Sequence, residues 1–100
     1  MQEITDVVQH DSFIAKNPRG IMFYGSVRCP HCRNMKPVVD RMIQQYPSVA
    51  FSHVETTQVE VIHVDGVPVF VGYKNGSPVD VVIGASPEDL KDLIEKKLLK

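Results

Sequence analysis

The chain has 100 residues and a formal net charge of −1 at pH 7, and it contains 43% hydrophobic and 23% charged residues, proportions usual for a globular protein. This length suits one domain, residues 1–100, with a single core. The near-zero charge and the absence of a long apolar run argue against nucleic acid or a membrane as partner. No secretory signal opens the chain, so we expect a reducing cytoplasmic compartment. We also expect a monomer.

The first half of the chain predicts strand, helix, strand and helix in turn. Asp6, followed three residues later by Gln9, forms a capping box that opens the first helix. The buried face of that helix is expected to carry Val7 and Ile14, flanked by Val8 and Phe13. The predicted elements are an edge strand at 2–4, a helix at 6–16, a strand buried on both faces at 21–24, and a helix at 30–45 that contains Pro37.

The second half predicts a strand, a crossover, a hairpin and a final helix. Asn75-Gly76 between two alternating runs is a strong hairpin signal. Ser86 and Pro87 form the start of the last helix, as N-cap and first helical residue. The predicted elements are strands at 49–54, 69–74 and 79–83, a short crossover helix at 56–64, and a last helix that buries Leu90, Leu93, Ile94 and Leu98. The fold class is therefore α/β, with a mixed four- to five-stranded sheet and helices on both faces.

The only two cysteines lie in Cys29-Pro30-His31-Cys32, where a buried strand meets the second helix. Free backbone N–H groups and the helix dipole at such a turn stabilise a thiolate. We therefore expect Cys29, outside the first turn, to be the exposed nucleophile. Cys32, on the apolar face of the helix, is expected to be buried and to resolve the mixed disulfide.

Basic residues without nearby acids surround this pair. No Asp or Glu occurs from Ser12 to Val39, whereas that stretch holds Lys16, Arg19, Arg28, Arg33 and Lys36. Arg28 and a protonated His31 are expected to favour ionised Cys29. A lower pKa of Cys29 stabilises the dithiol and makes the disulfide more oxidising.

Three blocks of the chain resemble thioredoxin-fold thiol–disulfide oxidoreductases, and the resemblance covers nearly all of it. They are the Cys29–Cys32 motif followed by Pro37, the Gly66-Val67-Pro68 loop, and the 73–76 turn followed by Val82-Ile83-Gly84-Ala85. The resemblance implies a redox-active Cys29–Cys32 disulfide and no other cofactor. It also implies a cis proline at Pro68, and a substrate-binding surface made of Arg28, Pro30, Val67, Pro68 and Gly84. Protein disulfides or dithiols are the implied substrates, with a reductase or glutathione for recycling.

The chain departs from this family pattern beside the cysteines. Arg28 replaces the usual tryptophan, Phe23 replaces a buried acid, and His53 stands where many members have lysine. His53 or His31 is then a candidate proton relay for Cys32. The central Pro-His is similar to that of DsbA-type oxidases. We accordingly expect a reduction potential between those of the two families, roughly −180 to −240 mV.

Other interpretations of the cysteine pair are weaker. The two thiols could be structural, or could form a zinc half-site completed by His10, His53 or His63. His10 and His63 are otherwise expected to be surface residues without a role. The functional alternatives are a glutaredoxin-like, glutathione-dependent reductase and a non-catalytic thioredoxin-fold module that binds an extended peptide.

Overall fold

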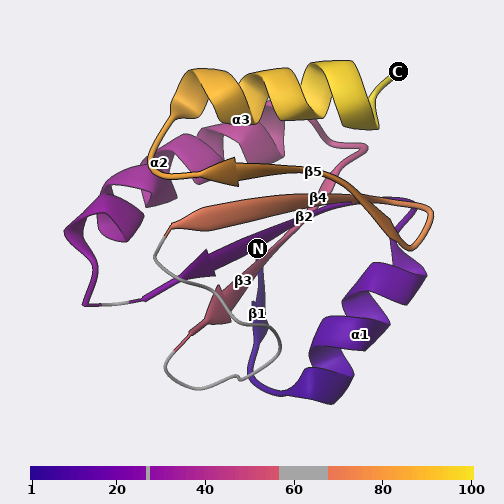
Figure 1. The fold of residues 1–100 in the computed structure, drawn as a ribbon, viewed down its shortest axis with the longest axis horizontal. Coiled ribbons are helices and arrows are strands. Elements are labelled where there is room, and N and C mark those ends of the chain that lie inside the picture. Colours follow the sequence, from indigo (N-terminus) through magenta and orange to yellow (C-terminus); the bar gives the residue numbers. More distant parts are fainter. Residues whose placement is uncertain (27, 57–67) are drawn as a thin grey trace.

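The computed structural model describes residues 1–26, 28–56 and 68–100 and shows a five-stranded mixed sheet between helices (Figure 1). The strand order is β1-β3-β2-β4-β5, with β1, β3 and β2 parallel and β4 antiparallel to both of its neighbours. This sheet confirms the predicted fold class. The elements are β1 (Gln2–Ile4), α1 (Val7–Lys16), β2 (Arg19–Gly25), α2 (Pro30–Gln45), β3 (Ala50–Glu55), β4 (Val69–Lys74), β5 (Ser77–Ile83), α3 (Pro87–Leu93) and the π-helical turn η1 (Ile94–Leu98).

The central strand β2 separates two cores. Side chains alternate between the faces of a strand, so Ile21 and Phe23 pack under α2 and α3, whereas Met22 and Tyr24 pack against α1. Figure 1 shows α2 and α3 together on one side of the sheet and α1 on the other. The prediction that this strand is buried on both faces is confirmed, because every residue of β2 after Arg19 is buried.

Helix α2 has the predicted bounds and carries the second cysteine into the larger core. Cys32, Met35, Val39 and Met42 are its buried residues, and Pro37 lies inside the helix. Pro30 occupies the first turn, where a missing N–H costs no helical hydrogen bond. The sequence pattern of apolar residues was therefore sufficient to orient this helix.

Helix α1 buries the phenylalanine of the predicted face but not its valines. Val7 and Val8 are exposed, and the buried residues are His10 and Phe13. A Cβ built at Gly20 would lie 2.9 Å from the Phe13 ring, so this glycine of β2 makes room for the phenylalanine. The helix thus turns its largest side chain, and not its valines, toward the sheet, because burying an aromatic ring removes more apolar surface from water.

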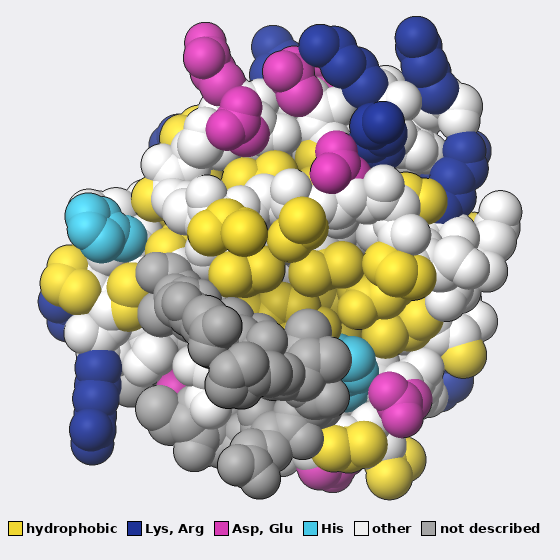
Figure 2. Space-filling model, in the orientation of Figure 1, with side chains coloured by type: hydrophobic (Ala, Val, Ile, Leu, Met, Phe, Trp, Pro, Cys, Tyr) yellow, Lys and Arg dark blue, Asp and Glu magenta, His cyan; other side chains and the backbone are white. Residues whose placement is uncertain are grey.

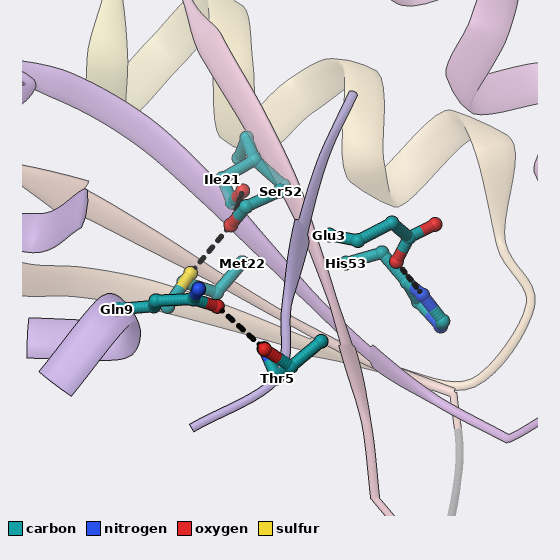
Figure 3. A network of polar contacts seen from close by, with 7 residues as sticks. All are labelled: Glu3, Thr5, Gln9, Ile21, Met22, Ser52 and His53. Atoms are coloured by element: carbon teal, nitrogen blue, oxygen red, sulfur yellow. Dashed lines mark hydrogen bonds and ion pairs between the residues drawn. The ribbon is translucent and has the colours of Figure 1, made fainter. Parts of the chain in front are cut away.

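The hydrogen bonds at the start of α1 differ in one detail from the predicted capping box. Asp6 is the N-cap, and its Oδ1 accepts from the Gln9 N–H at 2.8 Å, as expected. Gln9 Oε1, however, accepts from the N–H and the hydroxyl of Thr5 at 2.8 and 3.0 Å, one residue before the cap (Figure 3). The reciprocal bond of the box is therefore made one residue earlier than the sequence pattern indicated.

The expectation that His10 lies on the surface is wrong. Its side chain is buried, with Nε2 2.7 Å from the Tyr24 hydroxyl and Nδ1 3.1 Å from Asp11 Oδ1. A carboxylate only accepts, so Nδ1 carries a proton and donates to Asp11, and Nε2 forms the hydrogen bond with the Tyr24 hydroxyl. Burial raises the pKa of Tyr24 well above its ordinary value, which keeps this hydroxyl protonated.

Tyr24→Phe is expected to lower the free energy of unfolding by about 1–3 kcal/mol, because it leaves a buried ring nitrogen of His10 without its hydrogen-bond partner. Urea unfolding followed by circular dichroism measures this loss. Tyr46→Phe is the matched control: its hydroxyl donates to Glu95 Oε2 at 2.6 Å, and that partly exposed carboxylate can be hydrated instead. A loss at Tyr24 no larger than that at Tyr46 would contradict the proposed importance of the buried pair.

The C-terminal hairpin and helix follow the prediction closely. Asn75 and Gly76 both have positive φ, 53° and 86°, as a type I′ turn requires. Ser86 Oγ caps α3 by accepting from the Asp89 N–H at 3.3 Å. The expected residues Leu90, Leu93, Ile94 and Leu98 are buried, the last two in η1.

Strand β5 is covered on one face only. Val82 is buried in the larger core, whereas Val79, Val81 and Ile83 on the alternate positions are exposed. In the space-filling view, apolar side chains form a band across the middle of the molecule, where β4 and β5 run in Figure 1 (Figure 2). Helix cover on both faces is therefore complete for the centre of the sheet and incomplete at this edge.

Two predicted features lie outside the described residues: the crossover helix, beyond Thr56, and the Gly66-Val67 part of the loop before Pro68. Among the residues that are described, no helix is long and apolar enough to cross a membrane.

Candidate active site

Cys29 is the N-cap residue of α2. Its backbone is extended, its N–H donates to the Ser26 carbonyl at 3.1 Å, and its own carbonyl accepts from the Arg33 N–H at 3.2 Å. Its Sγ accepts from the Cys32 N–H at 3.2 Å. The sulfur thus fills the position in which a serine or aspartate oxygen usually caps a helix.

The two cysteines differ in burial as the sequence predicts. Cys29 is partly exposed, and Cys32 is 4% exposed and packs with Phe23 and Met35 in the larger core. No disulfide joins them, so the structure shows the dithiol form. This asymmetry allows one sulfur to meet a substrate while the other stays covered.

The surroundings of Cys29 lower its pKa. The largest cause is the hydrogen bond from the Cys32 thiol; the backbone N–H groups of Cys32 and His31 and the positive charge of Arg33 act in the same direction. From the sequence, Arg28 and the ring of His31 were expected to lower the pKa of Cys29. Both of those residues are exposed, and the Arg33 side chain lies one helical turn after Cys29.

The surroundings of Cys32 have the opposite effect and raise its pKa to about 11, from an ordinary 9.0. Burial is the largest cause, followed by the hydrogen bond it gives to Cys29; the negative charge of Glu55 adds to both. The two thiols therefore differ: Cys29 ionises more readily than an ordinary cysteine, and Cys32 less readily.

This raised pKa predicts that the reduced protein loses stability as pH rises from about 9 to 11. A group whose pKa is higher in the folded state stabilises that state fully below its unfolded pKa and progressively less up to its folded pKa. Cys29, whose folded pKa is lowered, opposes this trend only near its ordinary pKa of 9.0, and above about pH 10 it is ionised in both states. Urea unfolding of the reduced protein at several pH values measures the slope.

Cys32→Ala is the control for this slope, since it removes the titrating thiol. The variant is expected to start from a lower stability, because it removes a buried sulfur, and to lose less between pH 9 and 11 than the wild type. Tyr46, whose pKa is raised to about 12 mainly by its hydrogen bond to Glu95, titrates in both proteins and cancels in the comparison. Equal slopes would contradict the prediction.

A pocket of about 310 Å³ opens beside Cys32. Phe23 lies on its wall, at the position where the resemblance implied a buried acid, and Arg33 and Lys36 supply positive charge. His53 lies on the same wall, and the centroid of its ring is 5.2 Å from the centroid of the Phe23 ring. The full lining is Met1, Phe23, Ser26, Cys32, Arg33, Lys36 and His53. The structure thus brings the sequence candidate His53 to the same pocket as Cys32.

Glu55, at the end of β3, is a site residue that the sequence analysis missed. It is 8% exposed, one of the few buried charged residues in the described part of the chain. Ala50–Glu55 is a strand, so Phe51, His53 and Glu55 share one face of it. That alternation, read together with the buried strand 21–24, was the signal that could have found it.

Pro68 and Gly84 are brought together at the open end of the hairpin. The Gly84 N–H donates to the Pro68 carbonyl at 2.8 Å, Pro68 is buried, and Gly84 has a φ of +101°. Since Val69 pairs with Tyr24 in antiparallel register, Pro68 follows on next to Gly25. Both residues therefore lie at the strand end from which the chain continues to Cys29.

The remaining predicted site residues form the exposed rim of the turn. Arg28, Pro30 and His31 are all exposed, and the Arg28 N–H donates to Ser26 Oγ at 3.2 Å. Val67 lies outside the described residues. Over the described ranges, no three or more His, Cys, Asp or Glu side chains are grouped so as to hold a metal ion.

Comparison with known proteins assigns this architecture to one family. The thioredoxin family model matches residues 2–96. Thioredoxin 1 of Plasmodium falciparum is 31% identical over an alignment of 97 residues, which covers 93% of this chain and 93% of that one. A solved structure of Plasmodium falciparum thioredoxin superposes with a TM-score of 0.91 at 30% identity, over 97% of this chain and 99% of that one. Mitochondrial thioredoxin 3 of Saccharomyces cerevisiae gives a TM-score of 0.91 at 26% identity, over 96% and 94%.

These matches extend over the sheet, the helices and the cysteine turn together. Thioredoxins are thiol–disulfide oxidoreductases whose only redox group is their own cysteine pair, and the described dithiol fits that chemistry without a further cofactor. The chain belongs to the thioredoxin family and is a thiol–disulfide oxidoreductase.

Proposed function

We propose that the protein exchanges disulfides with protein substrates, with Cys29 as nucleophile and Cys32 as resolving thiol. The observation that carries this assignment is the asymmetry of the pair: a partly exposed sulfur of lowered pKa at a helix start, beside a buried sulfur of raised pKa. Thiol–disulfide exchange needs both a thiolate that can reach the substrate and a second thiol that can release it.

The proposed reaction has two exchanges. The Cys29 thiolate attacks one sulfur of a substrate disulfide, forms a mixed disulfide and expels the other substrate sulfur as a thiolate. Cys32 then attacks Cys29 Sγ, which forms the Cys29–Cys32 disulfide and expels the second substrate sulfur. The substrate gains two electrons and the protein loses them, so a reductase or glutathione must restore the dithiol.

We propose that the substrate chain lies over the rim formed by Arg28, Pro30, Val67, Pro68 and Gly84. The hydrogen-bonded Pro68–Gly84 pair and the exposed Pro30 support this surface, since they border the strand end that leads to Cys29. His31 contributes its backbone N–H to the thiolate.

Insulin reduction with dithiothreitol as electron donor tests the proposed activity directly. A glutaredoxin-like enzyme would instead be fast in a hydroxyethyl-disulfide assay coupled to glutathione. We expect a strong insulin activity and a weak glutathione-coupled activity, because the relatives that match over the whole chain are thioredoxins. The reverse ranking would favour the glutathione-dependent alternative.

We also propose that the Cys29–Cys32 disulfide is more oxidising than that of ordinary thioredoxin, with a potential of roughly −180 to −240 mV. Support comes from the lowered pKa of Cys29, since a stabilised thiolate favours the dithiol. Equilibration with glutathione buffers measures the potential. A value near thioredoxin's, about −270 mV, would contradict the proposal.

Arg33→Gln tests how much the positive charge of Arg33 contributes to the pKa of Cys29 and to the reduction potential. Removing the positive charge that lowers the pKa of Cys29 is expected to raise that pKa and to make the potential more negative. Arg41→Gln, an equal charge change at an exposed position farther along α2, is the matched control and is expected to leave the potential unchanged.

For its setting we propose a monomer in the reducing cytoplasm, re-reduced there by a reductase or glutathione. A catalytic pair of thiols in an otherwise cysteine-free chain supports a compartment that keeps thiols reduced. Cell fractionation and light scattering test compartment and oligomeric state separately.

A further inference from the structure

Release of the substrate depends on a sulfur that is protonated at neutral pH. Burial, the largest cause of the raised pKa of Cys32, persists when Cys29 is in a mixed disulfide, so this thiol stays mostly protonated at pH 7. The attack on Cys29 Sγ under the proposed function therefore needs a group that takes the Cys32 proton. Phe23, at the position of the family's buried acid, has no atom that can accept one.

The pairing of β2 with β3 puts Glu55 on the same face of the sheet as Cys32. Paired residues of neighbouring strands project to the same side, and the register here is Ile21 with Phe51, Phe23 with His53 and Gly25 with Glu55. The first two pairs face the core beneath α2, as shown by the shared cluster of Ile21 and Phe51 and by the ring contact of Phe23 and His53. Glu55 follows on that face by alternation.

Gly25, the strand partner of Glu55, makes room for the Phe23 ring and for the sulfur. A Cβ built at Gly25 would lie 2.9 Å from Phe23 Cε1 and 3.3 Å from Cys32 Sγ, so these two groups occupy the place where a side chain of this residue would begin. Neighbouring strands are about 4.8 Å apart, and the strand partner of Gly25 is Glu55. The Glu55 side chain therefore projects from β3, next to the residue of β2 against which Cys32 Sγ lies.

The other titratable or charged groups around Cys32 are less suited to accept its proton. Arg33 and Lys36, on the pocket wall, are cations, and Cys29 becomes the electrophile once it is in a mixed disulfide. His53 is the remaining candidate from the sequence. Its Nδ1 lies 2.7 Å from Glu3 Oε2 on the edge strand β1, and Figure 3 shows the ring paired with that carboxylate.

We propose that the Glu55 carboxylate accepts the proton of Cys32 during resolution, directly or through one water. As the proton moves to Glu55, Cys32 Sγ attacks Cys29 Sγ and the bond between those two sulfurs forms. The bond from Cys29 to the substrate sulfur breaks, and the electron pair leaves with the substrate as a thiolate, which takes a proton from water. The influence of the Glu55 charge on the pKa of Cys32 supports their proximity.

This inference rests on the proposed function, and one kinetic experiment separates the two. The reduced protein is mixed with dithiobis-nitrobenzoate, an aromatic disulfide that releases one coloured thiolate when Cys29 attacks and a second when Cys32 resolves. The first release depends on reagent concentration and the second does not. Glu55→Gln keeps the shape of the side chain but cannot accept a proton at neutral pH.

At pH 7, Glu55→Gln is expected to slow the second release about 10-fold or more and to leave the first unchanged. The difference should shrink as pH approaches the pKa of Cys32, where the thiol ionises without help. Glu55→Asp, which keeps a carboxylate, is expected to restore part of the rate. Glu88→Gln, an exposed acid on α3, is the matched control and should behave as the wild type.

The sign of the effect excludes a purely electrostatic role. Removing a negative charge that raises the pKa of Cys32 would, by itself, increase its thiolate fraction and speed the second release. An unchanged or faster second release in Glu55→Gln would overturn the proposal, as would a slow release in His53→Asn alone. A wild-type protein that releases only one thiolate would instead contradict the proposed function.

Discussion

Cys29→Ser is expected to abolish insulin reduction, lowering the rate by at least about 10³-fold, because the other thiol, Cys32, is buried and has a raised pKa. A serine hydroxyl is not ionised at neutral pH, even with the backbone N–H groups of His31 and Cys32 directed at it. The turbidity that accompanies insulin reduction measures the loss, and circular dichroism confirms that the variant folds.

The same variant distinguishes catalysis from peptide binding. A non-catalytic module would retain its partner and its effect when Cys29 is serine, since a single oxygen-for-sulfur exchange barely alters the rim of Pro30, Pro68 and Gly84. Residual insulin reduction close to the wild-type rate would contradict the assignment of Cys29 as nucleophile.

Cys32→Ser is expected to stop turnover while leaving the first attack intact. Cys29 still forms a mixed disulfide, but no second thiol releases the substrate, so the adduct accumulates. Mass spectrometry of the variant after reaction with a peptide disulfide is expected to show one peptide per protein, bound through Cys29. Rapid release of the peptide without added thiol would contradict the resolving role of Cys32.

A pair of variants at the same position tests why Cys29 is acidic. The largest contribution to its lowered pKa is the hydrogen bond from the Cys32 thiol. Serine can donate a similar bond and alanine cannot, so the pKa of Cys29 is expected to be higher in Cys32→Ala than in Cys32→Ser. Thiolate absorbance in the ultraviolet as a function of pH measures both values, and equal values would assign the shift to the backbone N–H groups and Arg33.

Most of the fold could be predicted because its signals are local. The period of apolar residues set the face of α2, Ser86 and Pro87 set the start of α3, and Asn75-Gly76 set the hairpin turn. Helix α1 was harder, because its apolar pattern is irregular. There the choice of buried face depended on a complementary partner in another element, Gly20 opposite Phe13 and Tyr24 opposite His10.

The candidate site also has a part that local sequence predicts and a part that it does not. From the sequence alone, the cysteine pair and the proposed roles of its two sulfurs could be inferred, because their spacing within one turn and one helix is enough. The family resemblance marked Phe23 as the position of a missing acid. Only the tertiary structure decided which distant groups surround Cys32. Strand register placed His53 and Glu55 on its face of the sheet, and the missing side chain at Gly25, the strand partner of Glu55, leaves room for the Phe23 ring and the Cys32 sulfur. Such proximity depends on how strands far apart in the sequence align, which no local pattern of residues specifies.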